Sequence, residues 1–197
     1  MFTGIVETMG VVTGVTDLDG GRRFAIAAPE IADGLTVGAS IAVQGACLTA
    51  IHCTDSEFTV ELVSETLART SLGGISENDR VNLERAMATD GRFDGHLVQG
   101  HVDGVGTVRH VSPEGQGARI SIAYPADLRR YVVHKGSITV DGVSLTVAKL
   151  DEDGFEIALI PHTLAVTTLG SLVPSAPVNL EVDILAKYVE RLMEARA

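Results

Sequence analysis

Cys47 and His101 are the residues of this chain best suited to covalent and proton-transfer chemistry near neutral pH. A thiol is a soft nucleophile, although a free cysteine is more often a small buried apolar residue. A histidine titrates near neutral pH and suits general acid–base work. His96 lies five residues before His101 in the same segment, and inter-domain hydrogen bonding is the alternative role for both. We favour His101 for the chemistry.

The second cysteine and the other histidines offer less. Cys53 lies in an apolar strand pattern and is predicted to be core. Two cysteines make neither a disulfide framework nor a thiolate cluster for zinc. The spacing of His96 and His101 is not a metalloprotease helix motif and no third ligand is visible, so we predict no metal site. We give no chemical role to His52, His110 and His134.

Cys47 lies in a segment that the chain repeats at an offset of 96 to 97 residues. Ser40–Thr49 returns as Ser137–Thr146, and Val63–Gly73 returns as Ile160–Gly170. Two copies in the same order predict two similar domains, since small domains have roughly 100 residues. We predict domains at 1–88 and 97–184, a linker at 89–96 and a terminal helix at 185–197.

Alternating apolar and polar residues predict strands in both copies, for example Glu57–Leu62 and Phe155–Leu159. Turn residues such as Pro113-Glu114-Gly115 separate the strands. Strands do not alternate with helices, so we predict an all-β fold. Each half is expected to be a small closed antiparallel barrel, because closure removes exposed sheet edges. Brief helical turns are predicted to begin near Ser64 and Pro161.

The terminal helix carries one apolar stripe. Its residues fall at i, i+3, i+4, i+7 and i+8, and they are Leu185, Tyr188, Val189, Leu192 and Met193. A helix of this length is marginal alone. The stripe therefore either folds back over its own barrel or packs with the same helix from other copies, and the sequence leaves both open.

The composition limits the partners. With 45% apolar and 21% charged residues the chain is globular, and its net charge of −11 argues against a nucleic acid or an anionic membrane. We therefore predict a small-molecule ligand. The N-terminal sequence lacks a signal-peptide pattern and no apolar stretch is long enough to span a bilayer, so we predict a cytoplasmic protein.

Positions shared by the two copies are candidates for the common scaffold and for a common ligand surface. Gly4 and Gly100 would let a ring approach the main chain. Threonines recur in both copies and can bond carbonyl or hydroxyl groups, although they are also ordinary strand and turn residues. Positions that differ are where one copy has specialised. Cys47 aligns with Ser144, Ile5 with His101, Glu65 with His162, Gly38 with Lys135, and Ala86 with Asp183.

Several separated motifs together resemble the riboflavin synthase family, alpha chain. They are the N-terminal segment Met1–Glu7, the Gly45–Thr49 turn, the segment Gly95–Gly104 between the two copies, and Asp141–Thr146, which repeats the first turn in the second copy. The resemblance implies two six-stranded Greek-key barrels, a C-terminal helix that joins subunits into trimers, and no cofactor. It implies that two molecules of 6,7-dimethyl-8-ribityllumazine become riboflavin and 5-amino-6-ribitylaminouracil by transfer of a four-carbon unit. Such a reaction needs two like sites face to face.

The resemblance also implies roles for individual residues. Catalytic positions are Cys47, His101, Ser40, Lys135 and Asp183. Substrate-binding positions are Gly4, Ile5, Val6, Cys47, Leu48, Thr49, Glu61, Leu62, Val63, Ser64, Glu65, Thr66, Gly100, His101, Val102, Lys135, Ser144, Leu145, Thr146, Ala158, Leu159, Ile160, Pro161, His162 and Thr163. Partners are two further copies of the chain and an association with lumazine synthase.

Two other functions fit parts of the pattern. A lumazine-binding antenna or storage protein would share the duplicated barrels and bind without turnover, but would be expected to lose the chemistry of Cys47 and His101. A flavin-dependent oxidoreductase should show a nicotinamide-binding region, and Gly104-Val105-Gly106 is a lone fragment with no P-loop elsewhere. We therefore hold the synthase first and the antenna second.

Overall fold

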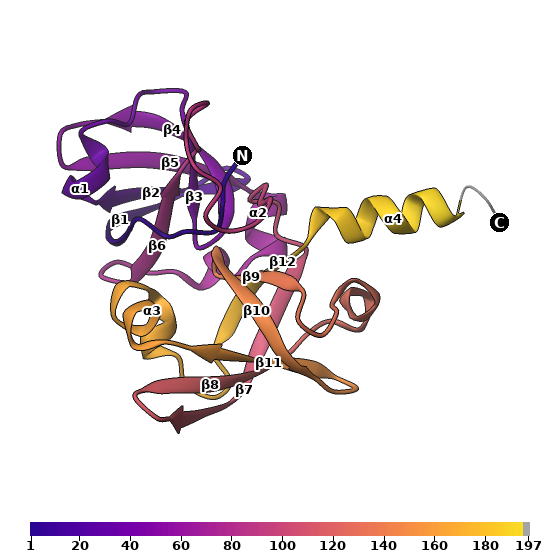
Figure 1. Cartoon of the computed structure of the whole chain (residues 1–197). Helices are drawn as coiled ribbons and strands as arrows, with labels where there is room; N and C mark the ends of the chain where they lie inside the picture. The colour runs from indigo at the N-terminus through magenta and orange to yellow at the C-terminus, as the bar shows by residue number, and fades with distance from the viewer. Residues whose placement is uncertain (195–197) are drawn as a thin grey trace.

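A computed structural model describes residues 1–194, whose strands close into two antiparallel barrels that follow one another along the chain (Figure 1). The first barrel contains β1 (Thr8–Leu18), β2 (Gly21–Ala27), β3 (Ser40–Val43), β4 (Ala46–Cys53), β5 (Glu57–Val63) and β6 (Arg80–Arg85). The second contains β7 (Gly104–Glu114), β8 (Gly117–Ala123), β9 (Ser137–Val140), β10 (Val143–Leu150), β11 (Gly154–Leu159) and β12 (Pro177–Val182). The prediction of two closed six-stranded barrels is confirmed.

Both barrels have one connectivity. The order around the first is β1-β2-β5-β4-β3-β6, and the second repeats it as β7-β8-β11-β10-β9-β12. The strand that returns beside β2 or β8 makes a Greek key. Period-two patterning turns alternate side chains inward, so that Phe24 faces Val60 and Ile26 faces Phe58 across β2 and β5, all fully buried.

Short helices join the strands. They are α1 (Pro29–Ala32), α2 (Ser64–Arg69), η1 (Ser71–Gly74), η2 (Ala126–Tyr131), α3 (Pro161–Val166) and η3 (Thr168–Ser171). The helical turns predicted at Ser64 and Pro161 are confirmed. In both copies one threonine ends the α-helix, because the hydroxyls of Thr70 and Thr167 donate to the carbonyl oxygens of Thr66 and Thr163.

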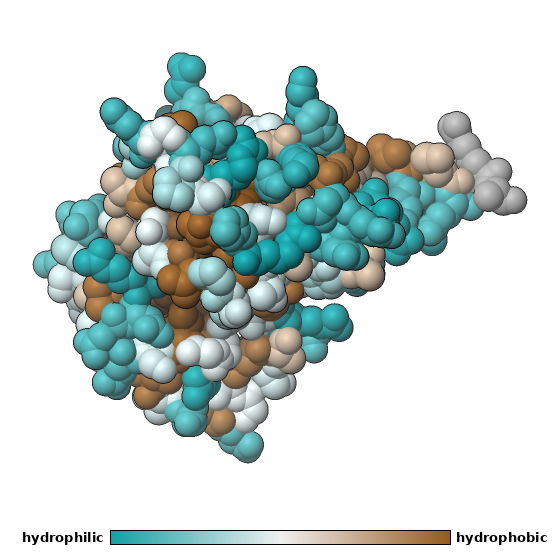
Figure 2. All heavy atoms as spheres, turned by 90° about the horizontal axis from the view of Figure 1, so that it is seen from below, coloured by the Kyte–Doolittle hydropathy of each residue, from teal (hydrophilic) through white to brown (hydrophobic). Residues whose placement is uncertain are grey.

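The last helix, α4 (Ile184–Glu194), projects away from the barrels (Figure 1), and residues 195–197 of the predicted helix lie outside the described residues. Its polar side meets the second barrel, where Glu190 pairs with Arg130 at 2.7 Å. The five stripe residues are 55–68% exposed, and Figure 2 shows apolar side chains along one edge of the helix. The stripe is therefore not covered by its own barrel. None of the helices of residues 1–194 has the length and apolar character to cross a bilayer.

A buried polar cluster joins the barrels with the symmetry of the repeat. The side-chain amide of Asn82 donates to the carbonyl oxygen of Asp141 at 2.9 Å, and that of Asn179 donates to the carbonyl oxygen of Gln44 at 2.8 Å. All four residues are at least 93% buried. Because buried polar groups are costly to leave unpaired, these reciprocal bonds fix how the barrels sit against each other.

Candidate active site

Two arms, residues 2–6 and 98–102, lie between the barrels and pair with each other. The main chains of Phe2 and Val98 exchange two hydrogen bonds, of 2.8 and 3.2 Å, and both side chains are buried. Val6 packs against the core of the second barrel, and Val102 packs against the core of the first. Each arm precedes one barrel in the chain but contacts the other barrel.

The crossing brings each arm to a residue with a reactive side chain. The carbonyl oxygen of Gly100 accepts the N–H of Cys47 at 2.8 Å, and the carbonyl oxygen of Gly4 accepts the N–H of Ser144 at 2.7 Å. Both glycines have φ near +77°, which favours glycine. A Cβ atom on either would lie 2.6 Å from the Cβ of Cys47 or Ser144. The structure thus gives these glycines a packing role, besides the close approach to a ring predicted from the sequence.

Cys47 and His101 line one cavity of about 370 Å³, together with Glu65 and Thr66. Cys47 is half-buried and His101 is exposed. Alignment of the two copies pairs His101 with Ile5 and Cys47 with Ser144, so the repeat by itself does not predict that Cys47 and His101 share a cavity. The crossed arm brings them together. A thiol and an imidazole in one cavity can supply nucleophilic and acid–base chemistry.

The predicted binding positions on β4, β5, β10 and β11, and Ile160 directly after β11, follow the strand alternation. Side chains directed out of the barrels are those of Thr49, Glu61, Val63, Thr146, Ala158 and Ile160. Leu48, Leu62 and Leu159 face inward with at most 6% exposure, and Leu145 packs against the second core. These leucines can reach a ligand through their main chain but not through their side chains.

Ser144, the counterpart of Cys47, has a histidine partner that the sequence ranked second. The ring Nδ1 of His96 lies 2.7 Å from the hydroxyl oxygen of Ser144, and its Nε2 is buried without a hydrogen-bond partner among the described residues. Burial lowers the pKa of His96, although the negative charge of Asp183 acts to raise it. A neutral imidazole on a hydroxyl can accept its proton. The only signal in the sequence was the spacing from His101.

Comparison with known proteins identifies the family of the chain. Residues 3–86 and 99–183 each match the lumazine binding domain. The chain is 49% identical to the riboflavin synthase of Mycobacterium bovis over 99% of both chains. It belongs to the riboflavin synthase family. The enzyme of Actinobacillus pleuropneumoniae is 43% identical over 98% of this chain and 90% of its own.

The fold of this riboflavin synthase family member is also that of LumP. A crystal structure of LumP complexed with riboflavin superposes with a TM-score of 0.85 at 26% identity, covering 92% of this chain and 99% of LumP. Family membership makes the chain an enzyme of the transferase class. The resemblance found in the sequence is thereby confirmed.

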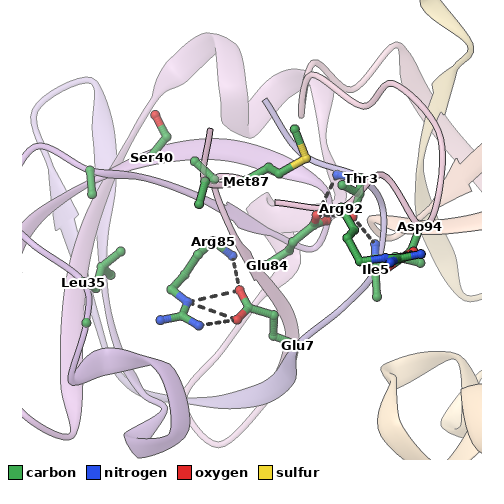
Figure 3. A pocket seen from close by; sticks show the side chains of 14 residues that line it. Thr3, Ile5, Glu7, Leu35, Ser40, Glu84, Arg85, Met87, Arg92 and Asp94 are labelled. Atoms are coloured by element: carbon green, nitrogen blue, oxygen red, sulfur yellow. Dashed lines mark hydrogen bonds and ion pairs between the residues drawn. The ribbon is translucent and has the colours of Figure 1, made fainter. Parts of the chain in front are cut away.

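Three further positions that the riboflavin synthase family resemblance implied lie elsewhere in the chain. Ser40 lines a second cavity of about 520 Å³ (Figure 3), where Arg85 pairs with Glu7 at 2.6 Å. Asp183 lines a groove of about 580 Å³ beside α4 and caps that helix, since its carboxylate accepts the N–H of Leu185. Lys135 is exposed and lines none of these cavities. One chain thus distributes the five catalytic candidates over separate places.

The described residues contain no cluster of three or more His, Cys, Asp or Glu side chains placed to hold a metal ion. The raised pKa of Cys53 is caused by burial, and this thiol packs against the first core.

Proposed function

We propose that this protein converts two molecules of 6,7-dimethyl-8-ribityllumazine into riboflavin and 5-amino-6-ribitylaminouracil by transfer of a four-carbon unit. Membership in the riboflavin synthase family supports the reaction. The structural observation that carries it is the cavity shared by Cys47 and His101. A nucleophile and an acid–base group beside one ring are what an electrophilic acceptor lumazine requires.

Each half of the chain would hold one lumazine, in a site made from one barrel and the arm that crosses to it. The first-barrel site takes Cys47, Leu48, Thr49, residues 61–66 and the arm residues Gly100, His101 and Val102. The second-barrel site takes Ser144, Leu145, Thr146, residues 158–163 and the arm residues Gly4, Ile5 and Val6. Two similar sites suit a reaction between two copies of one substrate.

The chemistry divides between the two sites. One lumazine loses a proton from its 7-methyl group and becomes a carbanion delocalised over the ring. The other is activated as the acceptor by addition of a nucleophile at C7, and this nucleophile is either the thiolate of Cys47 or a group that Cys47 holds. His101 moves a proton in the same cavity, and the neutral His96 beside Ser144 gives the second barrel a proton acceptor of its own.

The complete site would form between subunits of a homotrimer. Ser40 on the first barrel and Lys135 and Asp183 on the second lie in separate places of one chain. The exposed stripe of α4 offers an apolar surface to the same helix of neighbouring copies. Trimer formation would then be part of catalysis. An association with lumazine synthase and a cytoplasmic location belong to the same proposal.

Turnover of lumazine alone tests the proposal. The purified protein is incubated with 6,7-dimethyl-8-ribityllumazine without a reductant, and riboflavin fluorescence is followed. An increase in riboflavin supports the synthase. The likeness to LumP favours a second candidate, a protein that binds lumazine or riboflavin without converting them. Tight binding with no product would identify that function instead.

A further inference from the structure

Two buried glutamates hold the crossed arms by their main chain. Glu84 on β6 accepts the N–H of Thr3 at 2.6 Å on one oxygen and the N–H of Gly4 at 3.0 Å on the other. Glu181 on β12 does the same for Gln99 at 2.7 Å and Gly100 at 2.9 Å. The two glutamates are 97 residues apart and at most 6% exposed. Figure 3 shows Glu84 directed toward Thr3.

Neither glutamate forms an ion pair within residues 1–194. Arg85 pairs with Glu7, and Lys187 pairs with Asp103 at 2.6 Å. Burial raises the pKa of both carboxyl groups, while the main-chain N–H groups lower it. A buried carboxylate without a cation is costly, and an apolar residue would avoid that cost. Because a buried glutamate is nevertheless present at this position in both barrels, we look for a role that needs its two acceptor oxygens.

That role is to clamp two successive N–H groups at once. A carboxylate has an acceptor oxygen for each, whereas an amide has one acceptor and one donor group. The second clamped N–H belongs to Gly4 or Gly100, whose carbonyl oxygen in turn accepts the N–H of Ser144 or Cys47. A chain of hydrogen bonds therefore leads from each glutamate to a reactive position of the opposite barrel.

We propose that Glu181 and Glu84 are crossed positioning residues: Glu181 of the second barrel sets Cys47 and His101 in the first-barrel site, and Glu84 of the first barrel sets Ser144 in the second-barrel site. The predicted change in kcat rests on the proposed function. The structural part of the inference, that a change in one barrel alters the reactive residue of the other, is independent of that function.

The test compares Glu181→Gln and Glu84→Gln in the full chain, with Cys53→Ser present so that Cys47 is the only thiol. Asp141→Asn is the matched control, because it changes another buried acid between the barrels that touches neither glycine. Alkylation of Cys47 by iodoacetamide is followed by mass spectrometry. The kcat and KM for riboflavin formation are measured at 25 °C, and each Tm is recorded.

We expect Glu181→Gln to change the Cys47 alkylation rate by about threefold or more, since thiol reactivity follows its immediate surroundings. Glu84→Gln and Asp141→Asn should leave that rate within about twofold of the parent. Both Gln variants should lower kcat by about 10- to 100-fold with a smaller change in KM, because misplaced groups lose transition-state interactions. The Asn control should keep kcat.

Three results would overturn the inference. They are equal effects of both Gln variants on Cys47, no effect of Glu181→Gln on Cys47, and a lowered Tm with unchanged kcat. If the parent protein makes no riboflavin, the proposed function fails. The alkylation rates still show whether Glu181 of the second barrel positions Cys47 of the first. For a Gln variant that does not fold, amide shifts of the wild-type protein are followed against pH. Gly100 and Cys47 should then share one transition, and separate transitions would refute the inference.

Discussion

Gln44 and Asp141 occupy equivalent positions in the two barrels and accept the same main-chain hydrogen bond. The side-chain oxygen of Gln44 accepts the N–H of Asn82 at 2.7 Å, and that of Asp141 accepts the N–H of Asn179 at 2.8 Å. One is always neutral and the other is an acid. Burial raises the pKa of Asp141 to about 7, against the lowering effect of the bond from Asn179.

Asp141 should make the protein less stable as the pH rises. Between about pH 4 and pH 7 the unfolded chain has an ionised Asp141 while the folded chain keeps the proton, so the unfolded state binds fewer protons. The free energy of unfolding then falls by up to about 1.4 kcal/mol per pH unit from this group. Asn82 and Asn179, which hydrogen-bond to Asp141, carry no charge.

Asp141→Asn removes this dependence. Urea unfolding should show that the stability gained over the wild type grows from pH 4.5 to pH 7.5 and then levels off. The difference between the two proteins isolates Asp141 from Glu84 and Glu181, whose raised pKa values act in the same direction. Gln44→Glu should steepen the decline. Parallel curves for the wild type and the Asn variant would contradict the prediction.

The thiol of Cys47 should be needed for turnover. Cys47→Ala is expected to lower kcat/KM by at least about tenfold, a loss of about 1.4 kcal/mol of transition-state stabilisation. Cys53→Ala is the matched control, since Cys53 packs against the first core and lines none of the three cavities that contain candidate catalytic residues. Riboflavin fluorescence measures both. Equal activity of the two variants would exclude a role for Cys47.

His96 and Ser144 should act as one unit. Their 2.7 Å contact predicts that His96→Ala and Ser144→Ala each lower kcat, by about tenfold or more, and that the double variant loses little beyond either single one. A double-mutant cycle on kcat measures the coupling. Fully additive losses would show that the two side chains act independently.

The apolar stripe of α4 should hold subunits together. Val189 and Leu192 are 55% and 67% exposed, and a charge on either would have to be buried in a helix interface. Val189→Glu with Leu192→Glu is expected to give monomers that form riboflavin at less than about a tenth of the wild-type rate. Arg191→Ser, on the polar side of the same helix, is the control. Sedimentation and turnover measure the outcome, and an active monomer would refute the trimer proposal.

Much of the fold was predictable because its determinants are local. The alternation in Glu57–Leu62 specifies a strand with one inward face, and the repetition of Ser40–Thr49 as Ser137–Thr146 specifies two copies of one barrel. The helical turns at Ser64 and Pro161 follow from residues that favour helix starts. The stripe of α4 follows from its spacing.

The crossing of the arms was decided only in the tertiary structure. Residues 2–6 and 98–102 have no periodic pattern, and their partners lie in the opposite barrel. Alignment of the copies pairs Cys47 with Ser144. In the fold, Cys47 shares a cavity with His101, and Ser144 contacts His96. The sequence determined which groups the chain carries and two like barrels to hold them. Long-range packing between the barrels determined which groups meet, because contacts of high sequence separation leave no local signal.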